Sequence, residues 1–258
     1  MAFGSTSTPF YRWITFGRRV LLGVLLKVDS ARVTYPTEEE IQQYTDDIGS
    51  EYPLLPDVWG ACDGLKVPCE MSSFYNGWIH SIFVFAADGR IRMCVLNSPG
   101  SWHDSNQDDY SVYKKLKRIW LLFGARVVVD SSAFTLSNQH SDYLVKSYQL
   151  DDDDDAVGTT PEELLRHRSA STSIQQLSEW GMRMIQAKFP RLQDKMKYED
   201  IGERRVILNL MVLLYNFSCS KIGGHNEILS TFMHDRDNYF GRYENIGEEV
   251  DFDIFRTV

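Results

Sequence analysis

Two short apolar segments that contain an aspartate constrain the fold of this chain more than any other feature. The segment GARVVVDSSAF (residues 124–134) has three consecutive valines before Asp130, and VWGACDGLKV (residues 58–67) contains Asp63. Short runs of this kind, rich in small and β-branched residues, are typical of strands that are buried on both faces of a sheet. We expect one strand to end at Asp130 and the other to be interrupted at Asp63 and Gly64.

The other segments complete an alternation of helices and strands. Asp88 and Gly89 form a favoured turn pair, which predicts a hairpin over residues 80–97. Thr37 and Thr160 each precede a glutamate by three residues, which is the spacing of a capping box at the start of a helix. This order predicts an α/β fold with a mixed sheet flanked by helices. We expect helices over residues 10–27, from 37, over 105–120, from 160, over about 172–189 and about 203–217, and strands over 58–67, 82–86, 90–96, 124–130 and 142–148.

Size and charge limit the classes of protein that the chain can belong to. The chain has 258 residues, enough for one large domain with a short extra segment, and 43% of them are hydrophobic. The net charge of −9 argues against a uniformly basic nucleic-acid-binding surface, but it allows a local basic groove or an acidic metal site. The four cysteines form no CxxC pair, so their spacing does not predict a zinc site.

No secretory signal is evident, and the apolar runs are short. The runs over residues 20–26 and 206–217 fall well below the roughly 20 apolar residues of a membrane-spanning helix. We therefore expect a soluble intracellular protein in a reducing compartment.

Asp63 and Asp130 are the first candidates for a functional site. A carboxylate where a buried strand runs out is costly unless it is paired or bound to a cation. Ligand sites in α/β proteins gather at strand ends, and Mg²⁺ prefers oxygen ligands and often takes only one or two carboxylates. The alternative interpretation is that each aspartate is an ordinary turn residue or cap.

Six segments in series resemble a known family. In chain order they are VWGACDGLKV, FYNGWIHS, VFAADGRI, VLNSPGSWHDSN, VVVDSSAF and LSEWGMRMIQAKFPRL. They resemble PIF/Harbinger-type DDE transposases and the nuclease-like proteins derived from them, over roughly residues 50–230. The resemblance implies an RNase H-like catalytic domain with three metal-binding acids, which the matching motifs assign to Asp63, Asp130 and Glu179. It also implies a site that binds two divalent ions, Mg²⁺ or Mn²⁺. The implied reaction is the cutting and joining of DNA at transposon ends.

The resemblance also suggests supporting residues. His103 and Asp104 match the His-Asp pair of the family motif, and we expect them to orient the site. Asp104 is equally compatible with capping a helix that begins near residue 105. Glu179 falls nearly opposite the apolar face of its predicted helix, so an ordinary solvated glutamate is its alternative interpretation.

Several residues are candidates for contacts with DNA. Arg183, Lys188 and Arg191 follow Glu179 and are expected to contact phosphates, with simple surface charge as the alternative. Trp78 and Trp102 are candidates for stacking on bases, with core packing as the commoner role of a tryptophan.

The resemblance divides the chain into three parts. We expect a helical N-terminal segment over residues 1–50, the catalytic domain over residues 51–230 and a C-terminal tail over residues 231–258. The aspartate run near residue 151 predicts a mobile acidic insertion over about 149–160. By resemblance the protein is expected in the nucleus, and otherwise in the cytoplasm.

Two functional hypotheses remain. The first is a metal-dependent DNA endonuclease or transposase, and the second is a domesticated or decayed copy without catalysis that binds protein or DNA. The three acids favour the first. The second is favoured by the net negative charge of the chain and by the lack of a recognisable helix-turn-helix region. It is also favoured by the segment after Trp78, which looks shorter than in the family that the chain resembles. Specific DNA recognition would then need a separate DNA-binding partner protein, and a homo-oligomer is a further expectation. An RNase H-like hydrolase that acts on RNA is a third, weaker hypothesis.

Overall fold

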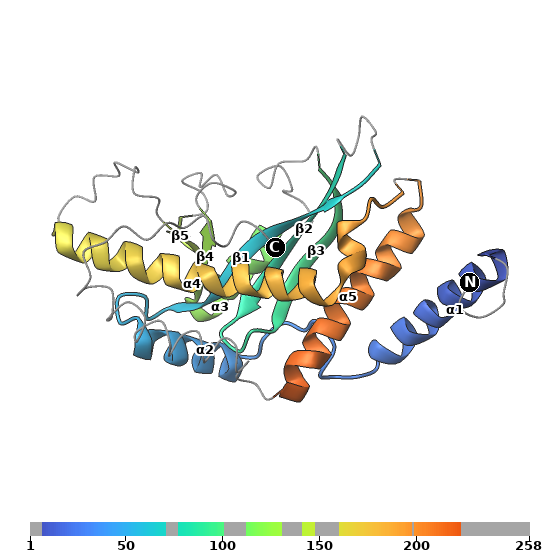
Figure 1. The fold of residues 1–258 in the computed structure, drawn as a ribbon. Helices are drawn as coiled ribbons and strands as arrows, with labels where there is room; N and C mark the ends of the chain where they lie inside the picture. Colours follow the sequence, from blue (N-terminus) through green and yellow to red (C-terminus); the bar gives the residue numbers. More distant parts are fainter. Residues whose placement is uncertain are drawn as a thin grey trace.

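A five-stranded mixed sheet forms the centre of the molecule (Figure 1). The computed structural model describes residues 7–70, 77–100, 112–130, 141–147, 160–197 and 199–222. The strand order is β3-β2-β1-β4-β5, in which β1, β2 and β3 pair antiparallel and β4 pairs parallel with β1 and β5. The strands are β1 (Val58–Pro68), β2 (Trp78–Ala86), β3 (Ile91–Pro99), β4 (Arg126–Asp130) and β5 (Leu144–Ser147). This arrangement confirms the predicted α/β fold and is consistent with an RNase H-like nuclease.

Helices cover both faces of the sheet, as predicted. Side chains of α2 and α3 share one hydrophobic cluster with the sheet, and those of α4 and α5 contribute to the cluster on its other face. Helix α1 extends away from the sheet and contacts α5 (Figure 1). The helices are α1 (Ser7–Leu25), α2 (Glu38–Glu51), α3 (Val112–Phe123), α4 (Pro161–Lys188) and α5 (Ile201–Ile222), with a short 3-10 helix, η2 (Pro190–Gln193). Among the described residues, no helix is long and apolar enough to cross a membrane.

Strand β1 corrects one prediction, because it runs without interruption through Asp63 and Gly64. Antiparallel pairing with β2 continues there, with Asp63 opposite Phe83 and Gly64 opposite Ile82. The imidazole of His80 explains the glycine, because a Cβ atom at Gly64 would lie 2.5 Å from His80 Nε2. Gly64 therefore serves close packing within the strand, not a break in it.

Helix α4 corrects a second prediction. The helix that begins after Thr160 and the one expected over 172–189 form a single element of 28 residues. Both capping boxes are confirmed: Thr37 with Glu40, and Thr160 with Glu163. Almost all of the predicted acidic insertion, and the whole predicted C-terminal tail, lie outside the described residues.

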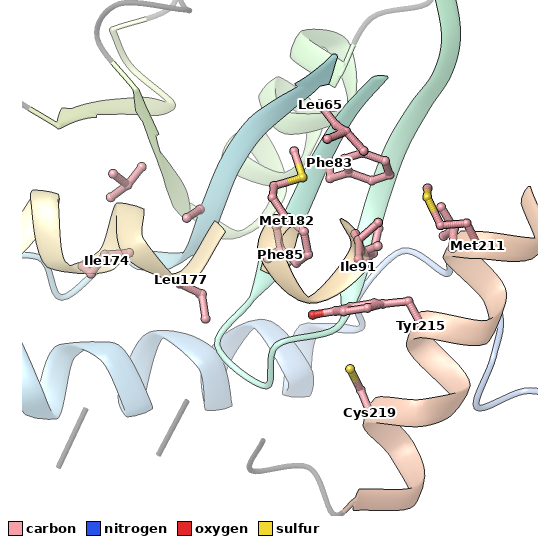
Figure 2. Close-up of a cluster of buried hydrophobic side chains, with 14 of the residues drawn as sticks. Leu65, Phe83, Phe85, Ile91, Ile174, Leu177, Met182, Met211, Tyr215 and Cys219 are labelled. Atoms are coloured by element: carbon pink, nitrogen blue, oxygen red, sulfur yellow. The ribbon is translucent and has the colours of Figure 1, made fainter. Parts of the chain in front are cut away.

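Helix α4 lies very close to the sheet at Gly181. A Cβ atom there would lie 2.4 Å from the ring of Phe85 on β2. Figure 2 shows Met182 of α4 and Tyr215 of α5 beside Phe85. Contact between the Phe85 ring and the helix backbone thus sets the height of α4 above the sheet.

Asn216 attaches α5 to the edge strand β3. Its side-chain oxygen accepts from the Ile91 amide at 2.9 Å, and its side-chain amide donates to the Ile91 carbonyl at 2.9 Å. Because Asn216 is fully buried, these bonds satisfy backbone groups that lie away from water.

Candidate active site

Asp63 and Asp130 lie beside each other on neighbouring parallel strands. The last paired residues of β1 and β4 are Cys62 and Val129, and each aspartate directly follows one of them. Adjacent strands are about 4.8 Å apart, so the two backbones bring the aspartates to one end of β4. The structure therefore brings together the two aspartates on which the sequence interpretation depends.

Strand alternation directs both aspartates toward the face that α4 covers. Ala61 and Val128 belong to the hydrophobic cluster that includes α4 residues, and each aspartate lies two residues further along its strand. Residues i and i+2 of a strand point to the same face. Both aspartates are half-buried, and the Gly64 amide donates to Asp63 Oδ1 at 2.6 Å, which orients that carboxylate.

Glu179 is an exposed residue of α4. Gln175 lies one helical turn before Glu179, and its Nε2 atom is 3.5 Å from the carbonyl oxygen of Cys62. Gln186 lies two turns after Glu179 and borders a cavity together with Leu65. At 3.6 residues per turn, Glu179 lies on the same flank of the helix as these two glutamines. This flank of α4 follows the part of β1 that contains Asp63.

Two neighbouring carboxylates match the oxygen ligands that Mg²⁺ prefers, and one or two carboxylates with water and phosphate often suffice. The donor set of Asp63 and Asp130 therefore fits a divalent cation. Within the described residues, however, no three His, Cys, Asp or Glu side chains form a group that could hold a metal ion. The structure thus does not bring Glu179 into such a group with the two aspartates.

His103 and Asp104 lie outside the described residues, beyond the end of β3 at Pro99. The three predicted phosphate ligands are exposed and have partners within the protein. The Arg183 guanidinium lies 5.5 Å from the ring centroid of Trp180, Lys188 Nζ donates to Ser218 Oγ at 2.7 Å, and Arg191 pairs with Asp194 at 3.2 Å.

Trp78 is not a core residue, although core packing is the commoner role of a tryptophan. It is 46% exposed and borders a cavity of about 270 Å³. Lys66, Gln186 and Gln193 border the same cavity. No local pattern indicated the two glutamines, because the fold brings them to Lys66 from more than 100 residues away.

The mixed sheet, with two aspartates side by side where β4 ends, has the form of an RNase H-like nuclease. The family model of the DDE superfamily endonucleases matches residues 63–216, which is more than half of the chain. The chain therefore belongs to the DDE superfamily endonuclease family, and the matched span includes Asp63, Asp130 and Glu179. This confirms the predicted superfamily. No curated protein and no solved structure gives a significant match to the chain.

Proposed function

We propose that this protein is a transposase-like DNA endonuclease of the PIF/Harbinger type, in which Asp63 and Asp130 hold a divalent cation. The parallel register of β1 and β4 carries this proposal, because it places the two carboxylates on neighbouring strands within the span that matches the family. Mg²⁺ is the expected ion and Mn²⁺ the alternative, with a second ion as the resemblance implies.

The proposed reaction is the hydrolysis of a phosphodiester bond. The oxygen of water forms a bond to phosphorus, and the bond to the 3′ oxygen breaks to leave a 3′-hydroxyl and a 5′-phosphate. In strand transfer, a DNA 3′-hydroxyl takes the place of water. Divalent ions at such sites stabilise the attacking and leaving oxygens.

Within this proposal each residue has a defined task. Asp63 and Asp130 bind the cation, and the Gly64 amide keeps the Asp63 carboxylate oriented. Glu179 is the third acid, supported by its place on the flank of α4 that follows β1. His103 and Asp104 are proposed to orient the site.

The proposed DNA path continues along α4. Arg183 follows Glu179 by one turn, so both lie on the same flank of the helix. Lys188 and Arg191 extend the basic surface to η2, where they are proposed to contact phosphates. A nuclear location and a separate DNA-binding partner belong to the same proposal.

The test is metal-dependent nicking of labelled duplex DNA, together with calorimetric titration of Mn²⁺. Asp63→Ala and Asp130→Ala should each abolish detectable cutting and weaken Mn²⁺ binding, and Glu179→Ala should abolish cutting. Asp46→Ala is the matched control, because Asp46 is an exposed aspartate of α2 that bonds to Gln42. The control should cut at the wild-type rate.

The second candidate is a transposase-derived protein without catalysis. Two observations favour it. The net charge of −9 opposes phosphate binding, and no three of the described acidic side chains form a group that could hold a metal ion. A folded wild-type protein that neither binds Mn²⁺ nor cuts DNA would support this candidate and refute the nuclease.

A further inference from the structure

An apolar groove of about 260 Å³ lies along α5, where the end of α4, η2 and α1 also contribute residues. Seven of the ten residues that border it are apolar. Three of them, Ile207, Leu210 and Leu214, follow the spacing i, i+3 and i+7, so they form one stripe along α5. We use the name α5 groove for the cavity that this stripe lines.

Within the described part of the chain, every charged residue that borders the α5 groove is basic. These residues are Arg18 of α1, Lys188 of α4 and Arg191 of η2. Both arginines pair with acidic residues of the protein, whereas Lys188 donates to the neutral hydroxyl of Ser218 at 2.7 Å. That contact leaves the positive charge of Lys188 uncompensated. An occupant that combines apolar side chains with negative charge is therefore complementary to the α5 groove.

This chemistry occurs in the segment EEVDFDIF (residues 248–255), which lies outside the described residues. The segment contains four acidic and four apolar residues. Val250, Phe252 and Ile254 alternate with acids, so an extended peptide of this sequence presents them on one side. They would span about 14 Å, and the apolar stripe of α5 spans about 11 Å. The two patterns therefore match in length as well as in charge.

The chain between this segment and α5 is long enough to reach the α5 groove. Residues 223–247, which are 25 residues, follow the end of α5 at Ile222. Leu214 lies about 12 Å before that end, and a flexible chain of 25 residues has a root-mean-square span of about 28 Å. A second acidic segment, over residues 151–155, contains no apolar residue. It precedes the first turn of α4, which lies about 40 Å along the helix from Lys188.

We infer that residues 248–255 bind in the α5 groove and keep DNA away from it. The apolar side chains of the segment pack on the stripe of α5, and its acidic side chains pair with Lys188 and Arg191. Both basic residues belong to the proposed DNA path, so the segment competes with DNA phosphates for them. A tether that gives a millimolar effective concentration keeps the groove occupied even when the separate segment binds weakly. The competition rests on the proposed function, whereas the binding of the segment does not.

Photocross-linking in the complete 258-residue chain tests the binding of the segment. The photoreactive residue p-benzoylphenylalanine replaces Phe252, and mass spectrometry locates the cross-link after illumination. The cross-link should form within one chain, to the part of α5 between Ile207 and Leu214 or to η2. Exchange of the four acids of the segment for their amides should largely abolish it.

The matched control exchanges four aspartates of the acidic run, residues 151–154, for asparagine. It changes the net charge equally and should leave the cross-link unchanged. The absence of a cross-link to the α5 groove, a cross-link that joins only two copies, or equal losses in both amide variants would overturn the inference.

Fluorescence anisotropy with a labelled duplex in EDTA tests the competition. Phe252→Ser with Phe255→Ser leaves the net charge unchanged, so it separates binding of the segment from general charge repulsion. This variant should bind the duplex up to about tenfold more tightly, because a groove that is occupied nine-tenths of the time lowers the apparent affinity by about that factor. The control at residues 151–154 should strengthen binding much less than the amide variant of residues 248–253.

Unchanged duplex affinity of the serine variant would overturn the competition between the segment and DNA. A different result separates this inference from the nuclease. If the cross-link to the α5 groove forms, but neither the wild type nor the serine variant binds or cuts DNA in Mg²⁺ or Mn²⁺, the nuclease and the competition are refuted and the binding of the segment stands.

Discussion

Replacing Gly181 by alanine tests whether α4 lies as close to the sheet as the structure places it. Alanine normally stabilises a helix relative to glycine by about 1 kcal/mol. At Gly181 we expect the opposite sign, because the added methyl group would enter the space of the Phe85 ring. Glu179 lies two residues away, so the position of α4 also sets the position of the proposed third acid.

The size of the effect follows from the distances. A Cβ atom at Gly181 would lie 2.4 Å from one ring atom of Phe85 and 2.8 Å from two others. Non-bonded carbon atoms pack at about 3.5–4.0 Å, so the helix or the ring must move by about 1 Å. The ring is confined by Tyr215 at 6.0 Å and Phe83 at 6.2 Å between centroids. Overpacking costs about 1–3 kcal/mol and the helix preference of alanine offsets about 1 kcal/mol of it, so the free energy of unfolding should fall by up to about 2 kcal/mol.

Urea unfolding followed by circular dichroism measures this change. Gly202→Ala is the control, because a Cβ atom there meets nothing within 4 Å, and it should leave stability unchanged or raise it by up to about 1 kcal/mol. Phe85→Leu combined with Gly181→Ala should cost at least about 1 kcal/mol less than the sum of the single changes, because the smaller side chain makes room. If Gly181→Ala stabilises the protein as Gly202→Ala does, the close approach of α4 to β2 is wrong.

Two further predictions concern stability. Asn216→Ala should lower the free energy of unfolding in urea by about 3 kcal/mol, because the buried amide and carbonyl of Ile91 lose their partner. The control, Asn209→Ala, should change this free energy by less than about 0.5 kcal/mol. Burial, and then the nearby charge of Arg126, lower the pKa of His167 below 6.5. Its contribution to stability is therefore present above pH 6.5 and lost as the pH falls through the folded pKa. His167→Asn should reduce the fall in melting temperature between pH 7 and pH 5, and an unchanged fall would contradict this cause.

Local sequence signals predicted the elements that depend on neighbouring residues. The capping box of Thr37 and Glu40 and the hairpin turn at Asp88 are confirmed, because each is formed by side chains within a few residues of one another. The interruption predicted in β1 was wrong, because Gly64 looked like a turn residue when its partner, His80, was still unknown. A glycine that makes room for a distant side chain has no local signature.

Contacts between distant segments explain what the sequence did not predict. Arg92 is a charged residue inside a strand, yet it is only 4% exposed, because Glu40 and Asp88 pair with it. Asp88 thus has a second role besides its place in the turn. The cavity bordered by Lys66, Trp78 and Gln193 is a similar case, since β1, β2, α4 and η2 each contribute residues to it. Such sites appear only when the packing of the elements is known.

The hydrophobic core and the candidate active site depend on the same strand register. Val127 and Val129 lie in the cluster with α2 and α3, and Val128 lies in the cluster with α4. Because strand side chains alternate with a period of two, a slip of one residue between β4 and β1 would exchange these faces. The same slip would turn Asp130 away from α4, toward the opposite face from Asp63. The valines before Asp130 therefore do more than bury a strand: by fixing its register, they place the two aspartates on one face of the sheet.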